Sequence, residues 1–209
     1  MRRFFFIVFL ISSNSFAQQK FYPVVYIDTL IDFTKEDSLA LNKELNILQS
    51  ILRNDTFWSR IKSATFYCTN RRIYHAKRSR KSIYPRIKKD KHFYTSTEIH
   101  DLIWNGEDEI GQSKDGIINL KLMAKDYEPN KNGSITHGST NKNTLIIKSN
   151  RATRIHSAIP GKYACHILHE YMHVLGFKHI DNSPTKNTEK CGGIDVPLRI
   201  QKIAESVLK

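Results

Sequence analysis

The chain has 209 residues, of which 40% are hydrophobic and 25% are charged, and its formal net charge is +13. This length and composition suit one domain with an ordinary core, and the absence of internal repeats or low-complexity linkers argues against a second domain. The positive charge favours acidic surfaces or substrates through long-range attraction but says little about the fold.

The N-terminus has the three-part layout of a secretory signal. A basic start is followed by the apolar run 4–11 and by the small residues Ser15 and Ala17 before the expected cut. The run is shorter than the roughly 20 residues that span a bilayer. We therefore expect residues 1–17 to be a signal peptide and residues 18–209 to be one domain of a secreted or periplasmic protein. The alternative is a buried first strand or an uncleaved anchor.

The first part of the expected domain reads as a strand followed by a helix. Residues 21–33 are rich in Val, Ile, Tyr and Phe and predict a strand. Thr34, three residues before Asp37, resembles a capping box, and it predicts the start of a helix that runs to about Leu52. We expect Asn54-Asp55 to end this helix. The leucines at helical spacing are Leu41, Leu45, Leu48 and Leu52.

The middle of the chain predicts mostly strands. Residues 64–69 are expected to form a strand, and residues 71–92 a long loop or an excursion between strands. A short helix is expected at 97–104. Residues 117–123 alternate apolar and polar side chains as a half-buried strand does, and residues 144–148 have a β-branched centre.

The last third of the chain is expected to be turn-rich at first and then helical. Turns are predicted at 130–143. A helix is predicted from about Lys162 to Leu175, halted by Gly176, and a final helix at 197–208. The whole order predicts an α/β sandwich of one sheet against two main helices, with a small C-terminal lobe.

The predicted helix at 162–175 carries His169 and His173 four residues apart. Four residues turn about 400° and rise about 6 Å, so both imidazoles leave one face and can reach a single metal ion. Glu170 points to the neighbouring edge of that face. It is placed to touch a metal-bound water and to act as its general base.

A catalytic zinc needs a third protein ligand and one open position. His179 would lie about 9 Å further along the axis if the helix continued. Gly176 removes this obstacle because glycine readily takes the left-handed conformation that ends a helix and turns the chain back. We therefore expect His179 to be the third ligand, with Asp181 as its rival.

The pattern His169-Glu170-x-x-His173-x-x-Gly176-x-x-His179 resembles that of the metzincin zinc peptidases, in particular their bacterial secreted, matrixin-like branch. The resemblance is strong over about 115–180. It implies a twisted, mostly parallel five-stranded sheet with an antiparallel edge strand beside the cleft, for which 144–148 is the candidate. It also implies a zincin-like domain with an upper lobe to about 176 and a lower lobe at 177–209.

The same resemblance implies a zinc endopeptidase with one catalytic Zn²⁺ and a protein or peptide substrate. We expect the enzyme to act as a monomer. The sequence departs from the metzincin pattern at one point, the methionine turn beneath the metal, because no methionine follows His179. We expect that turn at 191–194 or 196–198, with an apolar residue in its place. The departure keeps a second hypothesis open, a catalytically weak or inactive zinc protein that binds acidic polymers or proteins.

Two charged clusters have alternative interpretations. Residues 71–91 contain ten Lys or Arg, which form either a docking surface for acidic polymers or, more commonly, a solvated basic loop. Nucleic acid is not the partner we expect. The one acidic island lacks the ligand spacing of a recognised calcium site, so we expect helix-flanking charge there rather than bound calcium. Its members are Glu98, Asp101, Glu107, Asp108 and Glu109.

The remaining histidines and the cysteines are expected to be structural. His137, His156 and His166 are more typical of structural or surface groups than of ligands, although His166 lies near the ligand face, where a supporting role is open. Three cysteines in an exported chain predict one disulfide and one free thiol. We expect Cys165 to pair with Cys191, because both flank the metal motif.

Overall fold

The computed structural model describes the chain in several stretches, and every structural statement below refers to them. They are residues 21–66, 72–75, 86–89, 92–107, 115–140, 145–179 and 195–209. The predicted signal peptide, residues 1–17, lies outside the described residues, as does the rival ligand Asp181.

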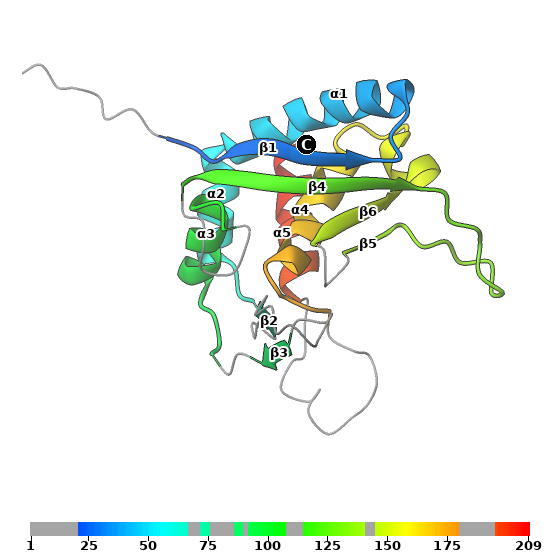
Figure 1. The fold of residues 1–209 in the computed structure, drawn as a ribbon. Helices are drawn as coiled ribbons and strands as arrows, with labels where there is room; N and C mark the ends of the chain where they lie inside the picture. Colours follow the sequence, from blue (N-terminus) through cyan, green and yellow to red (C-terminus); the bar gives the residue numbers. More distant parts are fainter. Residues whose placement is uncertain are drawn as a thin grey trace, which may run out of the picture.

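The described elements mix strands and helices, as predicted. In chain order they are β1 (Val24–Ile31), α1 (Lys35–Leu52), α2 (Asp55–Ser63), β2 (Arg72–His75), β3 (Arg86–Lys89), α3 (Ser96–Trp104), β4 (Ile117–Lys125), β5 (Gly138–Thr140), β6 (Ile146–Asn150), the π-helical turn η1 (Arg151–Ile155), α4 (Lys162–Val174) and α5 (Val196–Val207). Four of the strands form one sheet, and β2 and β3 form a separate antiparallel pair (Figure 1).

The main sheet has the strand order β1-β4-β6-β5. β1 and β6 both run parallel to β4, and β5 runs antiparallel to β6 at the edge. The predicted mostly parallel sheet with an antiparallel edge strand is therefore confirmed, with four strands described where the resemblance implied five.

The predicted identity of the edge strand is wrong. Most of 144–148 lies in β6, which is an interior strand between β4 and β5. The edge position belongs to β5, which comes from the stretch 130–143 that was predicted to be turn-rich. Three residues are too few to show an alternating pattern, so it is the pairing of β5 with β6 that makes it a strand.

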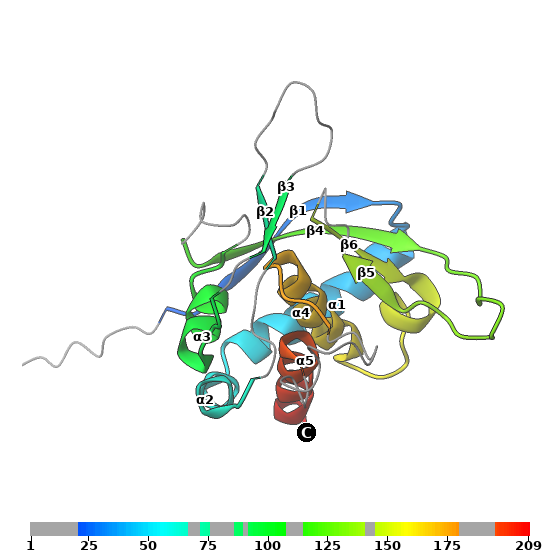
Figure 2. The same ribbon diagram turned by 90° about the horizontal axis from the view of Figure 1, so that it is seen from below.

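The helices cover one face of the sheet (Figure 2). α1 and α4 lie against this face, and α5 packs on α4 on the side away from the sheet. Strand β4 shows the reason in its alternating burial. The side chains on the helix side are buried, namely Ile118, Leu120 and Leu122, whereas the side chains between them are more exposed to solvent. The sequence pattern at 117–123 predicts this arrangement.

The N-terminal helices begin with side-chain caps. Thr34 Oγ1 accepts a hydrogen bond from the Asp37 N–H at 3.1 Å and Asp37 Oδ2 accepts one from the Thr34 N–H at 2.9 Å, which confirms the predicted capping box of α1. Asn54 follows α1 and caps a second helix, α2, by accepting from the Thr56 N–H at 2.8 Å. Helix α2 was not predicted from the sequence. Residues 64–66, expected to start a strand, are not in one.

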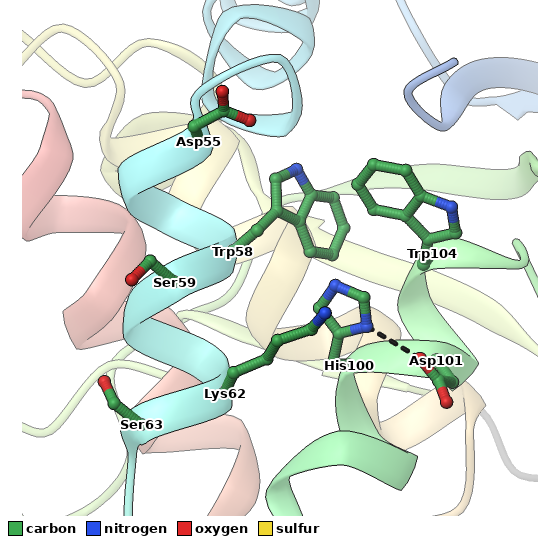
Figure 3. A pocket seen from close by; sticks show the side chains of 8 residues that line it. All are labelled: Asp55, Trp58, Ser59, Lys62, Ser63, His100, Asp101 and Trp104. Atoms are coloured by element: carbon green, nitrogen blue, oxygen red, sulfur yellow. Dashed lines mark hydrogen bonds and ion pairs between the residues drawn. The ribbon is translucent and has the colours of Figure 1, made fainter. Parts of the chain in front are cut away.

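Aromatic rings join α2 to α3, the helix predicted at 97–104. The rings of Trp58 and Trp104 meet edge to face at 4.8 Å, and His100 stacks on Trp104 at 5.4 Å. Trp58 Nε1 donates to the Leu52 carbonyl at 2.7 Å, so the indole is satisfied although it is buried. A pocket opens beside these rings, between Asp55 and Asp101 (Figure 3).

The remaining charged regions are described in part. The basic stretch 71–91, predicted as a loop or an excursion between strands, contains the hairpin β2–β3. In the acidic island, Glu98 belongs to the capping box of α3, which is the kind of role that was expected, whereas Asp101 lies inside α3 and bonds His100. No helix within the described stretches is long and apolar enough to cross a membrane.

The C-terminal helix α5 confirms the helix predicted at 197–208. Asp195 caps it by accepting from the Leu198 N–H at 3.0 Å, and Pro197 lies in its first turn. The predicted apolar turn is therefore not at 196–198, because these residues open α5. Its other predicted position, 191–194, lies outside the described residues.

Candidate metal centre

Helix α4 carries the predicted site and is anchored at its N-terminus by α1. The helix begins after Gly161, which has φ of 77° and offers no side chain to cap it. Glu44 of α1 takes over that role: its carboxylate accepts from the Gly161 N–H at 2.9 Å and from the Ala164 N–H at 2.8 Å. A carboxylate at a helix N-terminus satisfies free N–H groups and complements the helix dipole.

The chain reverses at the end of α4 as the sequence predicts. Gly176 has φ of 93°; its N–H donates to the His173 carbonyl at 3.0 Å, and the Phe177 N–H donates to the Met172 carbonyl at 3.0 Å. This pair of bonds is the Schellman motif, in which a left-handed residue closes the helix. Phe177 is buried, so the turn is fixed by packing as well as by hydrogen bonds.

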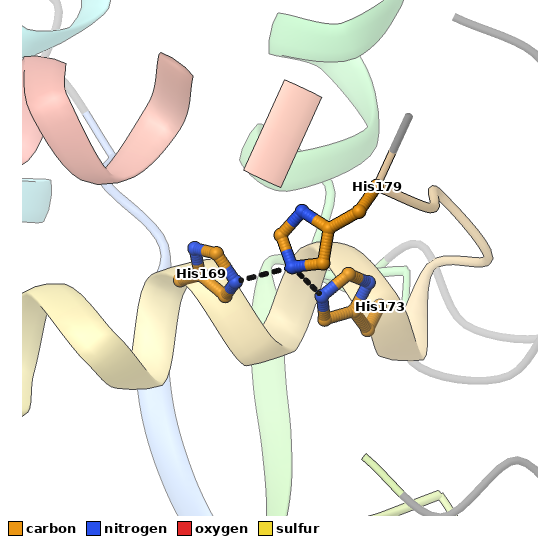
Figure 4. Close-up of side chains that lie close together, drawn as sticks. All are labelled: His169, His173 and His179. Carbon is orange, nitrogen blue, oxygen red and sulfur yellow. Dashed lines mark hydrogen bonds between the residues drawn. The ribbon is translucent and has the colours of Figure 1, made fainter. Parts of the chain in front are cut away.

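The reversal brings the three predicted ligands together (Figure 4). His179 Nε2 lies 3.2 Å from His169 Nε2 and 3.1 Å from His173 Nε2. Three nitrogens held tetrahedrally at about 2.0–2.1 Å from one zinc ion would lie about 3.3 Å apart. The three side chains are therefore able to hold a metal ion.

Hydrogen bonds on the far side of two rings decide which nitrogen faces the site. His173 Nδ1 lies 2.7 Å from the Phe177 carbonyl, and His179 Nδ1 lies 2.9 Å from Asp195 Oδ2. Both partners are acceptors, so each Nδ1 carries a proton, and in the neutral form of each ring Nε2 keeps its lone pair. Two lone pairs then face each other at 3.1 Å, an arrangement that a cation between them would satisfy. The residues present thus fit a metal.

Asp195 is a supporting residue that the sequence analysis missed. Its side chain is buried and joins His179 to the start of α5. Its position just before a predicted helix marks it as a cap. Nothing local in the sequence indicates that the same carboxylate also reaches a histidine 16 residues earlier.

Burial keeps the two helical histidines in the form that binds metals. Burial is the largest cause and the neighbouring imidazoles add to it; together they lower the pKa of His169 to about 3 and the pKa of His173 to about 4. His179 behaves differently, because its hydrogen bond to Asp195 raises its pKa above the usual value. His169 and His173 are therefore neutral at physiological pH, as metal ligation requires.

Glu170, the predicted base, lies on α4 between the two helical ligands and is buried. Thr140 Oγ1 of the edge strand β5 lies 2.8 Å from Glu170 Oε2 and can donate to it. Burial raises the pKa of Glu170, against the effect of the Thr140 hydrogen bond and the charges of His179 and Arg154. A carboxylate with a raised pKa in such a place is suited to take up a proton.

Three further histidines have the structural roles that were expected, namely His137, His156 and His166. His137 Nδ1 lies 3.0 Å from Thr153 Oγ1, and His156 Nε2 lies 2.6 Å from Asp37 Oδ1. His166 is buried beside the site, with its Nδ1 3.9 Å from Glu170 Oε1. It is not part of the ligand cluster.

The predicted disulfide is not present. Cys165 is buried in α4 as a free thiol, which contradicts its pairing with Cys191. Burial raises the pKa of this thiol to about 12, so Cys165 acts as a small core side chain. Cys68 and Cys191 lie outside the described residues.

Comparison of the chain with protein-family models, with curated proteins and with solved structures finds no match.

Proposed function

We propose that the chain is a secreted zinc-dependent endopeptidase of the metzincin type, with a zincin-like fold. The observation that carries the proposal is the convergence of His169, His173 and His179 through their Nε2 atoms, with the buried carboxylate of Glu170 on the same helix. Three imidazoles and a neighbouring carboxyl group are the donor set and the base of a hydrolytic zinc site.

The proposed roles follow from the geometry. A zinc ion held by the three histidines would act as a Lewis acid and would lower the pKa of a bound water towards about 7. Glu170 takes the proton of the attacking water and returns it to the leaving amine. The edge strand β5 offers its backbone to an extended peptide, which would then lie beside Glu170.

The deciding experiment compares Glu170→Gln with the unaltered protein in a cleavage-site profile over a broad peptide mixture. We expect Glu170→Gln to bind one zinc ion per chain and to lose activity by about 10³-fold or more, because the base is gone and the ligands remain. Glu205→Gln is the matched control, since Glu205 is an exposed residue of α5 bonded to Gln201. Equal cleavage by the protein with Glu170→Gln contradicts the mechanism.

A second candidate function is a zinc-holding binding protein without turnover. It is favoured by one observation, that no methionine follows His179 where metzincins place their supporting turn. One zinc per chain with no cleavage of any peptide in the mixture would support it. Tight binding of a hydroxamate to the metal, together with peptide cleavage, would support the peptidase instead. A hydroxamate can bind only if the metal has an open coordination position, which a catalytic zinc site also needs.

A further inference from the structure

The edge strand β5 contacts helix α4 at two positions with matching spacing. Gly138 and Thr140 are two residues apart, so they lie on one side of the strand about 6.8 Å apart. His166 and Glu170 are four residues apart on one face of α4, about 6 Å along its axis. Gly138 lies against His166, and Thr140 bonds Glu170. Strand and helix are therefore in contact along this whole length.

Gly138 permits this close approach. A Cβ at this position would lie 2.3 Å from His166 Nε2 and 2.9 Å from the Lys148 carbonyl oxygen, both far inside normal contact. The His166 ring is buried and the Lys148 carbonyl is backbone, so neither has room to retreat. A side chain at residue 138 would push β5 away from α4 and separate Thr140 from Glu170.

The Thr140 hydroxyl has two acceptors within reach on the same residue. Its Oγ1 lies 2.8 Å from Glu170 Oε2 and 3.1 Å from the Glu170 carbonyl oxygen. The hydroxyl has one proton, so it donates to one of them at a time, and the ionised carboxylate is the stronger acceptor.

We propose that Thr140 is a positioning residue that holds the Glu170 carboxyl group in place and ties it to the edge strand. The inference rests on the proposed peptidase function and extends it. Two of the three proposed metal ligands and the proposed base lie on α4, whereas an extended peptide would lie on β5. The Thr140–Glu170 bond links the base directly to the edge strand, so the distance from base to substrate depends on it.

The first test separates this role from binding and from metal loading. Thr140→Val removes the hydroxyl at nearly constant volume, Thr140→Ser keeps it, and Ser139→Ala removes an exposed hydroxyl from the same strand as a control. We expect Thr140→Val to lower kcat by about 10- to 100-fold with KM within about twofold, since a misplaced catalytic group slows the chemical step. Thr140→Ser should restore most of kcat, and zinc affinity should be unchanged in all three variants.

A second test does not depend on activity. In the metal-free protein we expect Thr140→Val to lower the midpoint of thermal unfolding by about 4 °C, because it leaves a buried carboxyl without its partner. In a Glu170→Ala background the same change should lower the midpoint by much less. Equal shifts in the two backgrounds overturn the contact.

The outcomes distinguish this inference from the proposed function. Coupled shifts with a kcat for Thr140→Val equal to that of the unaltered protein overturn the positioning role. Coupled shifts in a protein that binds zinc but cleaves no peptide leave the Thr140–Glu170 link standing and overturn the peptidase.

Discussion

Asp195 Oδ2 lies 2.9 Å from His179 Nδ1, while the other oxygen of the same carboxylate caps helix α5. The third candidate ligand, His179, is thereby connected to the start of the last helix, which packs on α4. A carboxylate in this position orients the ring and increases its basicity. In this chain the residue that orients the His179 ring is Asp195, which is also the N-cap of α5.

Asp195→Asn is predicted to weaken zinc binding by about 10- to 100-fold, the effect typical of losing an outer partner of a metal ligand. Asparagine is as good a helix cap as aspartate, so α5 should remain intact. Zinc affinity is measured by competition with a chromophoric chelator, with circular dichroism as the check on the helix. An unchanged affinity would show that Asp195 serves α5 alone.

Zinc binding to the metal-free protein is predicted to weaken as the pH falls. Protonation of His179 should set the pH at which this loss of affinity begins. The Asp195 carboxylate raises the pKa of His179, so a proton competes with zinc at His179 at a higher pH than it does at His169 or His173. In Asp195→Asn the loss of affinity should begin at a lower pH. Chelator competition between pH 5 and pH 8 tests this; identical profiles for the two proteins would contradict it.

Gly138→Ala is predicted to destabilise the protein by about 1–3 kcal/mol, as overpacking does, because its Cβ would overlap His166 and the Lys148 carbonyl. Peptidase activity should fall as well, since β5 would move away from Glu170. Urea unfolding measures the stability change, with Ser139→Ala as the control on the same strand. Full stability in Gly138→Ala would show that β5 is not held closely against α4.

Asp37→Asn is predicted to destabilise the protein near neutral pH by about 3 kcal/mol, the size expected when a buried ion pair loses one partner. Asp37 is buried and contacts Arg151 and His156 of the segment after β6, so it ties α1 to that segment. A measurement of urea unfolding at pH 7 gives the difference, and a change below about 0.5 kcal/mol would contradict the prediction.

The same substitution has a predictable dependence on pH. Burial raises the pKa of Asp37, but the Thr34 N–H, His156 and the Arg151 charge together outweigh it and hold the pKa below 3.8. A lowered pKa in the folded state means that the stabilisation is present above the unfolded pKa and is lost as the pH falls through the folded value. The difference between Asp37→Asn and the unaltered protein should therefore shrink below about pH 4. A constant difference down to pH 2 would contradict this.

The sequence by itself determined the helix that carries the candidate site and the placement of its ligands. The spacing of His169 and His173 and the glycine at 176 act within one turn of the chain, so local helix geometry is enough to bring His179 back. The capping box of α1 and the alternation in β4 are local in the same sense, and both are confirmed. Helix α2 was missed because Asn54 was interpreted only as the end of α1, whereas it is also the N-cap of α2.

Only the tertiary structure decided which residues support the site. Thr140 is 30 residues from Glu170, and Asp195 is 16 residues from His179. Neither contact can be predicted from the helical period of 3.6 residues or the strand period of 2 residues, because each depends on how a separate element packs against α4. The edge strand shows the same limit: Gly138–Thr140 has no pattern of its own, and it becomes a strand because β6 offers it a hydrogen-bonding edge and α4 leaves room for a glycine.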